Sequence, residues 1–173
     1  MRVVRTAAIT LAALCLAGSP VGLAHAQDNV SAQDETFVTS AHQGNLAEIA
    51  AGQDAGENAT TQCVKNAGAA LVRDHTRLDE ALTQLADRLG IPLPDQPTAE
   101  QQRTLDEVRA EAGTPAYDEK WLVTQEAAHE DTLALIDREL ETGTNADIKA
   151  AAEAARPVVE MHLEMVRGGV CHG

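Results

Sequence analysis

Three histidines and one glutamate stand where the helical spacing of apolar residues predicts a side chain that faces the core. His75, His129 and His162 each continue an apolar stripe in steps of three or four residues, and Glu48 does so in a fourth segment. Imidazole and carboxylate groups are ligands of transition metals. We therefore take these four residues as candidate metal ligands, with Glu126, three residues before His129, as a fifth and optional one.

The ligand types favour one Zn, Cu or Fe ion, because neutral imidazole suits all three metals. A carboxylate-bridged di-iron centre needs a Glu-x-x-His pair on each of two helices. Glu126 and His129 form one such pair, but valines stand three residues before His75 and His162. Asp79, four residues after His75, is the predicted outer partner of that histidine.

A second interpretation needs no metal. Buried histidines beside a carboxylate can form a hydrogen-bond network that fixes the register of packed helices. The chain would then be a non-enzymatic cell-envelope or interaction protein, and the sequence alone leaves both interpretations open. Two further histidines are predicted to play no part: His42 points away from the Glu48 face and is expected to be exposed, and His172 lies in the tail.

The overall charge excludes one class of partner. The chain has 173 residues and a formal net charge of −14, and nucleic-acid binding requires clustered Lys and Arg. It contains no nucleophile elbow, phosphate-binding loop or dinucleotide motif, so no enzyme class is indicated. Aromatic residues make up 2%, which argues against strands and for helices.

Four long helices are predicted over residues 33–59, 61–89, 115–142 and 146–167. Thr60 and Thr61 supply a cap between the first two, and Gly90, followed by two prolines, ends the second. A Gly-Thr-Asn break at 143–145 separates the last two. The connector over residues 91–114 is rich in proline and polar groups and is expected to hold a short helix at about 98–112.

The candidate ligands are also expected to lie at one height in the bundle. Two residues of an antiparallel hairpin are level when the turn lies midway between them. The midpoint between Glu48 and His75 falls at the Thr60-Thr61 cap, and the midpoint between His129 and His162 falls in the 143–145 break. Each hairpin therefore brings its two polar residues opposite each other.

The first 26 residues read as a signal peptide. Arg2 and Arg5 precede an apolar run over residues 6–17, and Ala24-His25-Ala26 has the small-x-small pattern of a cleavage site. The run is too short for a permanent membrane helix, so no stable membrane insertion is expected after cleavage. Residues 27–173 then form one exported domain, periplasmic or extracellular.

Two cysteines, Cys63 and Cys171, remain after cleavage of the signal peptide, and export would place them in an oxidising compartment. Two thiols in an oxidising compartment usually pair, and no CxxC spacing supports metal ligation instead. A bond between them requires the two hairpins to point in opposite directions, with residues 91–114 as a long crossover. The expected fold is therefore all-α, a ferritin-like four-helix bundle with a long crossover between helices 2 and 3.

Over nearly its whole mature length the chain resembles the exported, ferritin-like family named Domain of Unknown Function 4142. The matching pieces stand in order along the chain: Phe37, Glu48-x-x-x-Gly52, Val64, Arg73-Asp74-His75, Tyr117-Asp118, His129, and Pro157 followed by His162. The resemblance implies the fold and export, and it implies no reaction.

Overall fold

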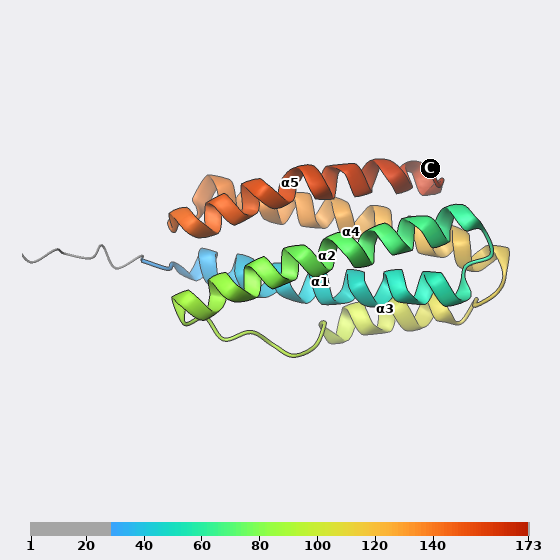
Figure 1. The fold of residues 1–173 in the computed structure, drawn as a ribbon, viewed down its shortest axis with the longest axis horizontal. Coiled ribbons are helices and arrows are strands. Elements are labelled where there is room, and N and C mark those ends of the chain that lie inside the picture. Colours follow the sequence, from blue (N-terminus) through green and yellow to red (C-terminus); the bar gives the residue numbers. More distant parts are fainter. Residues whose placement is uncertain (1–28, 173) are drawn as a thin grey trace, which may run out of the picture.

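The computed structural model describes residues 29–172, which form five α-helices (Figure 1). Their bounds are α1 Ala32–Asn58, α2 Gln62–Leu89, α3 Ala99–Arg109, α4 Pro115–Thr142 and α5 Ala146–Val166, followed by a short 3-10 turn at Arg167–Gly169. Among the described residues no helix combines the length and apolarity needed to cross a membrane. The predicted signal peptide, residues 1–26, lies outside the described part of the chain.

Local chemistry explains where the long helices begin and end. The Ser31 hydroxyl accepts a hydrogen bond from the backbone N–H of Asp34 at the start of α1, and Thr61 does the same at the start of α2. Gly90 ends α2 in the left-handed conformation, with φ of 70°. The Asn145 side chain caps α5 by accepting from the N–H groups of Asp147 and Ile148.

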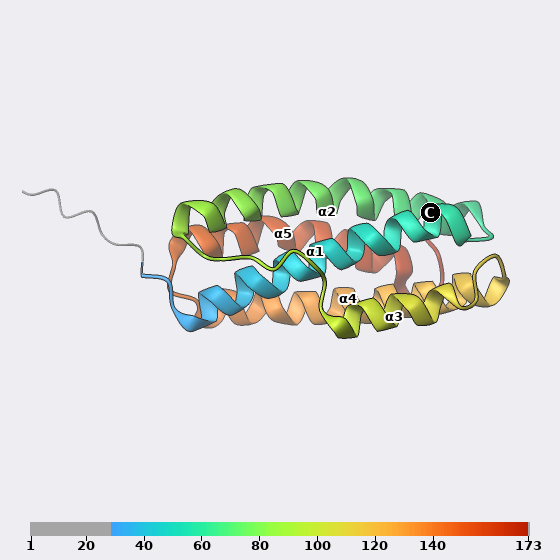
Figure 2. The ribbon, with the colours of Figure 1, turned by 90° about the horizontal axis from the view of Figure 1, so that it is seen from below.

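The two helical hairpins, α1–α2 and α4–α5, pack against each other to form the bundle. The crossover leaves the end of α2, runs back along the bundle and carries α3 before it reaches α4 (Figure 2). The expected all-α bundle with a long crossover between its second and third long helices is confirmed. The helix bounds agree with the predicted ones to within three residues at every end of the four long helices.

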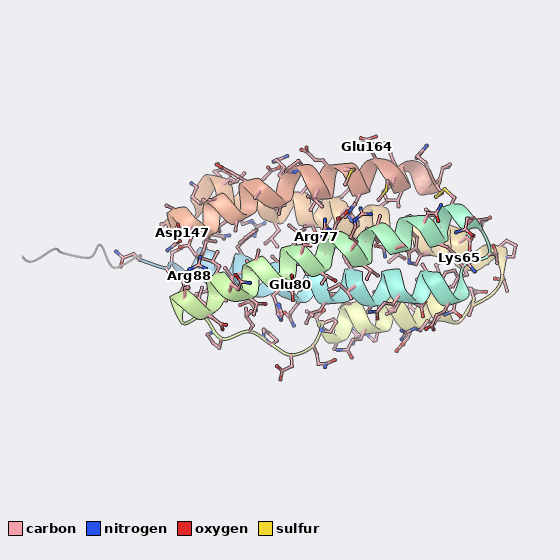
Figure 3. The ribbon with its side chains drawn as sticks, viewed as in Figure 1. Lys65, Arg77, Glu80, Arg88, Asp147 and Glu164 are labelled. Atoms are coloured by element: carbon pink, nitrogen blue, oxygen red, sulfur yellow. A yellow bond between two sulfur atoms is a disulfide. The ribbon has the colours of Figure 1, made fainter. Side chains whose placement is uncertain are left out.

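Two apolar cores fill the bundle, one towards each end. Phe37, Leu82, Ile136 and Ile148 are among the residues of the first core, which lies at the α4–α5 turn. Leu71, Tyr117, Trp121 and Val166 are among those of the second, which lies at the α1–α2 turn. Between the two cores, each long helix contributes buried polar side chains. The charged side chains of Arg77, Glu80, Arg88, Asp147 and Glu164 are exposed on the outside of the bundle (Figure 3).

A disulfide bond joins Cys63, at the start of α2, to Cys171, beyond the end of α5. The two half-cystines are 108 residues apart in sequence. The predicted pairing is confirmed, and with it the argument that the two hairpins point in opposite directions.

Helices α1 and α2 cross in close contact at Gly52 and Gly68. A Cβ atom added to Gly68 would lie 2.7 Å from the carbonyl oxygen of Gly52 and 2.9 Å from the Cβ of Ala55. A Cβ on Gly52 would meet the carbonyl oxygen of Gly68. Neither position has room for a side chain, so these two glycines allow the backbones of α1 and α2 to touch.

Helix α3 contacts α1 and α4 and is held by hydrogen bonds near both of its ends. At its C-terminal end, Arg109 donates from Nε to Oδ1 of the buried Asp54 at 2.6 Å, and Val108 packs in the second core. Ahead of its start, the Gln43 side chain donates to the carbonyl oxygen of Gln96 at 3.1 Å. Val108 is its one fully buried residue.

Candidate metal centre

The three histidines meet in the polar layer between the two cores. His75 comes from α2, His129 from α4 and His162 from α5, and all three are buried. Their ring centroids are 5.7 Å apart for His75 and His129, 5.2 Å for His75 and His162, and 5.5 Å for His129 and His162. One nitrogen from each ring lies within 4.8 Å of the other two. We call this group the histidine cluster.

Each ring of the cluster is oriented by one hydrogen bond to an oxygen atom around it. His75 Nδ1 donates to Asn45 Oδ1 at 2.9 Å, and His162 Nε2 donates to Asp74 Oδ2 at 3.1 Å. His129 Nδ1 donates to the backbone carbonyl oxygen of Gln125 at 2.7 Å. Because each partner is an acceptor, the bonded nitrogen of each ring carries the proton. A carboxylate, carbonyl or amide acceptor behind the imidazole is the usual support of a metal-binding histidine.

The second nitrogen of each ring has no hydrogen-bond partner. These atoms are Nε2 of His75, Nε2 of His129 and Nδ1 of His162, and all three are buried. A buried polar atom without a partner costs free energy, so three of them in one cluster require an explanation. With the proton held on the opposite nitrogen, each bears a free lone pair, which is the form that binds a metal ion.

Burial keeps the cluster uncharged at neutral pH. Desolvation, with repulsion from the other two imidazoles, lowers the pKa of His75 to about 3. Desolvation likewise lowers the pKa of His129 to about 4. The pKa of His162 is lowered by burial, although its bond to Asp74 acts in the opposite direction. Neutral imidazole is the form that binds a metal. At these low pKa values, a second proton competes with the metal for the free ring nitrogen only at acid pH.

Glu48 is buried beside the cluster and is not part of it. The three ring nitrogens group without a Glu48 oxygen. Instead, the side-chain amide of Gln125 faces the Glu48 carboxyl group, and with the amide nitrogen assigned to that side it donates to the carboxyl group, with 3.2 Å to Oε1. Burial raises the pKa of Glu48 to about 8, so the carboxyl group is mostly protonated at neutral pH. Its place as a fourth ligand stays a prediction.

Glu126 bonds the backbone of the turn that follows α5. Its carboxylate accepts hydrogen bonds from the backbone N–H groups of Gly168 at 2.7 Å and Gly169 at 3.2 Å. It therefore fixes the turn that follows α5 and carries the chain towards Cys171. The sequence did not predict this 3-10 turn or its two backbone donors, and the place of Glu126 as a fifth ligand stays a prediction.

His42 was predicted to be exposed and Asp79 to support His75, and both predictions are wrong because the two side chains bond each other. His42 is buried, and its Nδ1 bonds Asp79 Oδ1 at 2.7 Å while its Nε2 bonds the carbonyl oxygen of Pro94 at 2.9 Å. Asp79 thus supports His42 and not His75. The start of the crossover passes over His42, and its path could not be placed from helix spacing alone.

Sequence reasoning missed the roles of Asn45, Asp74 and Gln125 behind the cluster. Asp74 stands directly before His75 in sequence, yet it holds His162 of another helix. The carboxylate of Asp74 beside a histidine in sequence was the feature that could have indicated this role. Gln125 was predicted to face inward, one turn before His129, but its bond to His129 was not. Nothing in the sequence indicated Asn45.

Residues 19–168 match the model of the domain of unknown function DUF4142. The chain belongs to this family. The description of the DUF4142 family assigns no activity, so the match supports the predicted resemblance and leaves the cluster to be interpreted from its own chemistry.

One solved structure shares the fold of this DUF4142 chain. It is the crystal structure of a DUF305 fragment from Deinococcus radiodurans, with a TM-score of 0.69 and 12% sequence identity. The match covers 80% of this chain and 95% of that one. At this identity the similarity shows the helical bundle alone. No curated protein matches the sequence.

Proposed function

We propose that this protein binds one transition-metal ion, Zn, Cu or Fe, through His75, His129 and His162. One observation carries the proposal: three buried ring nitrogens without a partner lie in one cluster, while the other nitrogen of each ring donates to an oxygen behind it. A bound ion would satisfy all three nitrogens at once. Three imidazoles leave a further coordination position, for which Glu48 is our candidate.

The hydrogen bonds of the cluster favour the metal over a structural network. A network would join the histidines to one another, but the three bonds made by these rings lead to Asn45, Gln125 and Asp74. In a structural network every buried polar atom would also have a hydrogen-bond partner, whereas one nitrogen of each ring in this cluster has none. The observed arrangement supports metal coordination, and the structural interpretation becomes an outcome of the test.

Metal analysis of protein purified without a histidine tag and without added metal tests the proposal. We expect about one ion per chain, and we expect His129→Ala to abolish retention. His172→Ala is the matched control, because it removes an exposed imidazole from the tail and leaves the cluster intact.

Thermal melts give the second readout of the same proposal. An ion that binds only the folded site should raise the melting temperature of the wild type relative to the chelated protein. His129→Ala should not respond to the ion. Identical wild-type melts with chelator, Zn, Cu and Fe would refute metal binding and leave the histidines as structural residues.

We also infer that the domain is exported, to the periplasm or the outside of the cell. Support comes from the signal-like residues 1–26 and from the Cys63–Cys171 disulfide, which is typical of an oxidising compartment. N-terminal sequencing of the protein from the medium or the periplasm tests this, with a new terminus at residue 27 as the expected result. A cytoplasmic protein that begins at residue 1 would contradict it.

A further inference from the structure

A cleft of about 610 Å³ opens on one side of the bundle, between α1, α3 and α4. On α1 and α4 its lining includes five small residues, which are Gly44, Ala47, Ala51, Ala127 and Ala128. Helix α3 contacts both α1 and α4; it lies beside α1 in Figure 1 and along α4 in Figure 2. The cleft therefore exists because α1 and α4 present too little side chain to close it.

The ionisable side chains that line the cleft are all acidic, and the lining includes no Lys, Arg or His. Glu100 on α3 and Asp131 on α4 are exposed carboxylates, and Glu48 on α1 is buried. A cleft of one charge sign concentrates ions of the opposite sign and raises their rate of arrival. The chain as a whole carries a formal net charge of −14, which acts in the same direction. The cleft thus attracts cations.

A smaller chamber of about 120 Å³ adjoins the cleft and reaches the histidine cluster. Its wall includes His75 and Asn45, the residue that orients His75, and the rest is mostly apolar. Gly44 and Glu48 line both the cleft and the chamber. Glu48 is therefore the one carboxyl group at the junction of the two spaces, with the acidic cleft on one side and His75 on the other.

We propose that a metal cation reaches the three histidines through the cleft under α3, and that Glu48 passes it from the cleft to the cluster. This inference rests on the proposed metal binding and adds the route and a residue that acts in transfer. Glu48 is buried, so a hydrated cation that enters the junction exchanges water for an oxygen of Glu48 before it meets imidazole, and the carboxyl group gives up its proton to the displaced water. Glu100 and Asp131 act earlier, at the mouth of the cleft.

Gly44 allows the route to be blocked without disturbing the fold. A Cβ atom built on Gly44 meets no atom within 4 Å, which shows that the space at the junction is open. Gly44→Leu should fill this space, and replacement of a helical glycine favours the helix. Gly56→Leu is the matched control, because Gly56 also lies in α1 with no atom within 4 Å of an added Cβ, but lines neither space.

The experiment measures the rates of uptake and release of the ion that the wild-type chain retains in the metal analysis. We expect Gly44→Leu to slow both rates by a factor on the order of ten and to leave the affinity nearly unchanged, because a blocked path hinders both directions equally. Gly56→Leu should behave as the wild type. Equal rates in the two leucine variants would overturn the route.

Glu48→Gln tests the transfer residue separately. We expect slower uptake, by about tenfold, because the amide keeps the shape of the side chain and removes the acidic oxygen that can give up its proton and bind the cation. Glu57→Gln, an exposed position on α1, is the control and should change nothing. An uptake rate that Glu48→Gln leaves unchanged would overturn the transfer role, and weaker affinity at that rate would leave Glu48 only the place of fourth ligand proposed above. A wild type that retains no ion would refute the proposed function, whereas retention with unaltered rates in every variant would refute the route alone.

Discussion

At the scale of single residues, the cluster depends on which nitrogen of each ring holds the proton. Asn45, Asp74 and the Gln125 carbonyl each accept one N–H bond, and this leaves the second nitrogen of each ring unprotonated and without a partner. Burial removes the water that would otherwise donate hydrogen bonds to these three nitrogens. The metal-free cluster is therefore a source of instability that the two apolar cores must offset.

The lowered pKa values of the cluster predict how acid acts on His129→Gln in the chelated protein. A histidine with a folded pKa below 6.5 contributes stability that is complete above pH 6.5 and is lost as the pH falls, because the unfolded chain takes up the proton first. Between pH 7.5 and 5 this loss is about 2 kcal/mol for one histidine that stays neutral. The cost of His129→Gln should therefore shrink by about that amount over this range.

Urea titrations of the wild type and His129→Gln at both pH values measure this difference. The comparison between chains is needed because Glu48, with a raised pKa of about 8, acts in the opposite direction and stabilises the folded chain as the pH falls from 8. That contribution is common to both chains. A destabilisation by His129→Gln that is the same at the two pH values would show that His129 titrates normally in the folded protein.

At the scale of helices, the contact of α1 with α2 sets the height of Asn45 relative to His75. Substitution of Gly68 by Ala should force the two backbones apart, since the new Cβ would meet the Gly52 carbonyl oxygen at 2.7 Å. Overpacking of this kind costs about 1–3 kcal/mol. Thermal melts measure the cost, and Gly56→Ala is the control in open space. A Gly68→Ala protein as stable as the Gly56→Ala protein would contradict the close contact.

The four long helices could be predicted because their signals are local. Apolar spacing, the Thr61 and Asn145 caps and the Gly90 stop all act within a few residues of the bounds they set. The three inward histidines followed from the same spacing, and the turn midpoints placed them at one height. Contacts between segments distant in sequence could not be predicted in the same way.

His42 and Glu126 show what local signals omit. His42 bonds the carbonyl oxygen of Pro94 in the crossover. The Glu126 carboxylate accepts hydrogen bonds from the backbone of Gly168 and Gly169. Both partners belong to irregular segments, which have no hydrophobic period to read. The cleft under α3 was likewise beyond prediction, because it depends on where α3 rests on α1 and α4 and not on the bounds of α3 itself.

At the scale of the whole molecule, the disulfide and the crossover are the two covalent links between the hairpins. The disulfide spans 108 residues, and loss of a link of this length costs about 2–4 kcal/mol, because the unfolded chain regains the freedom that the link removed. The Cys63→Ser, Cys171→Ser double variant should therefore melt at a lower temperature than the oxidised wild type.

A reducing agent provides the control for this prediction. Reductant should lower the melting temperature of the wild type and leave that of the double variant unchanged, while mass spectrometry of the unreduced wild type should show the linked peptides. Wild-type melts that do not differ with and without reductant would show that the bond contributes nothing to the free energy of unfolding.

The Cys63–Cys171 bond also turns most of the chain into a closed ring. His75, His129 and His162 all belong to that ring, as does the exposed crossover, whereas Asn45 and Glu48 lie on the arm that leads into it. A single protease cut in the crossover would therefore open the ring without releasing a fragment. The nicked molecule would keep its three candidate ligands in one covalently connected body, and only the joint loss of the peptide bond and the disulfide would separate His75 from His129 and His162.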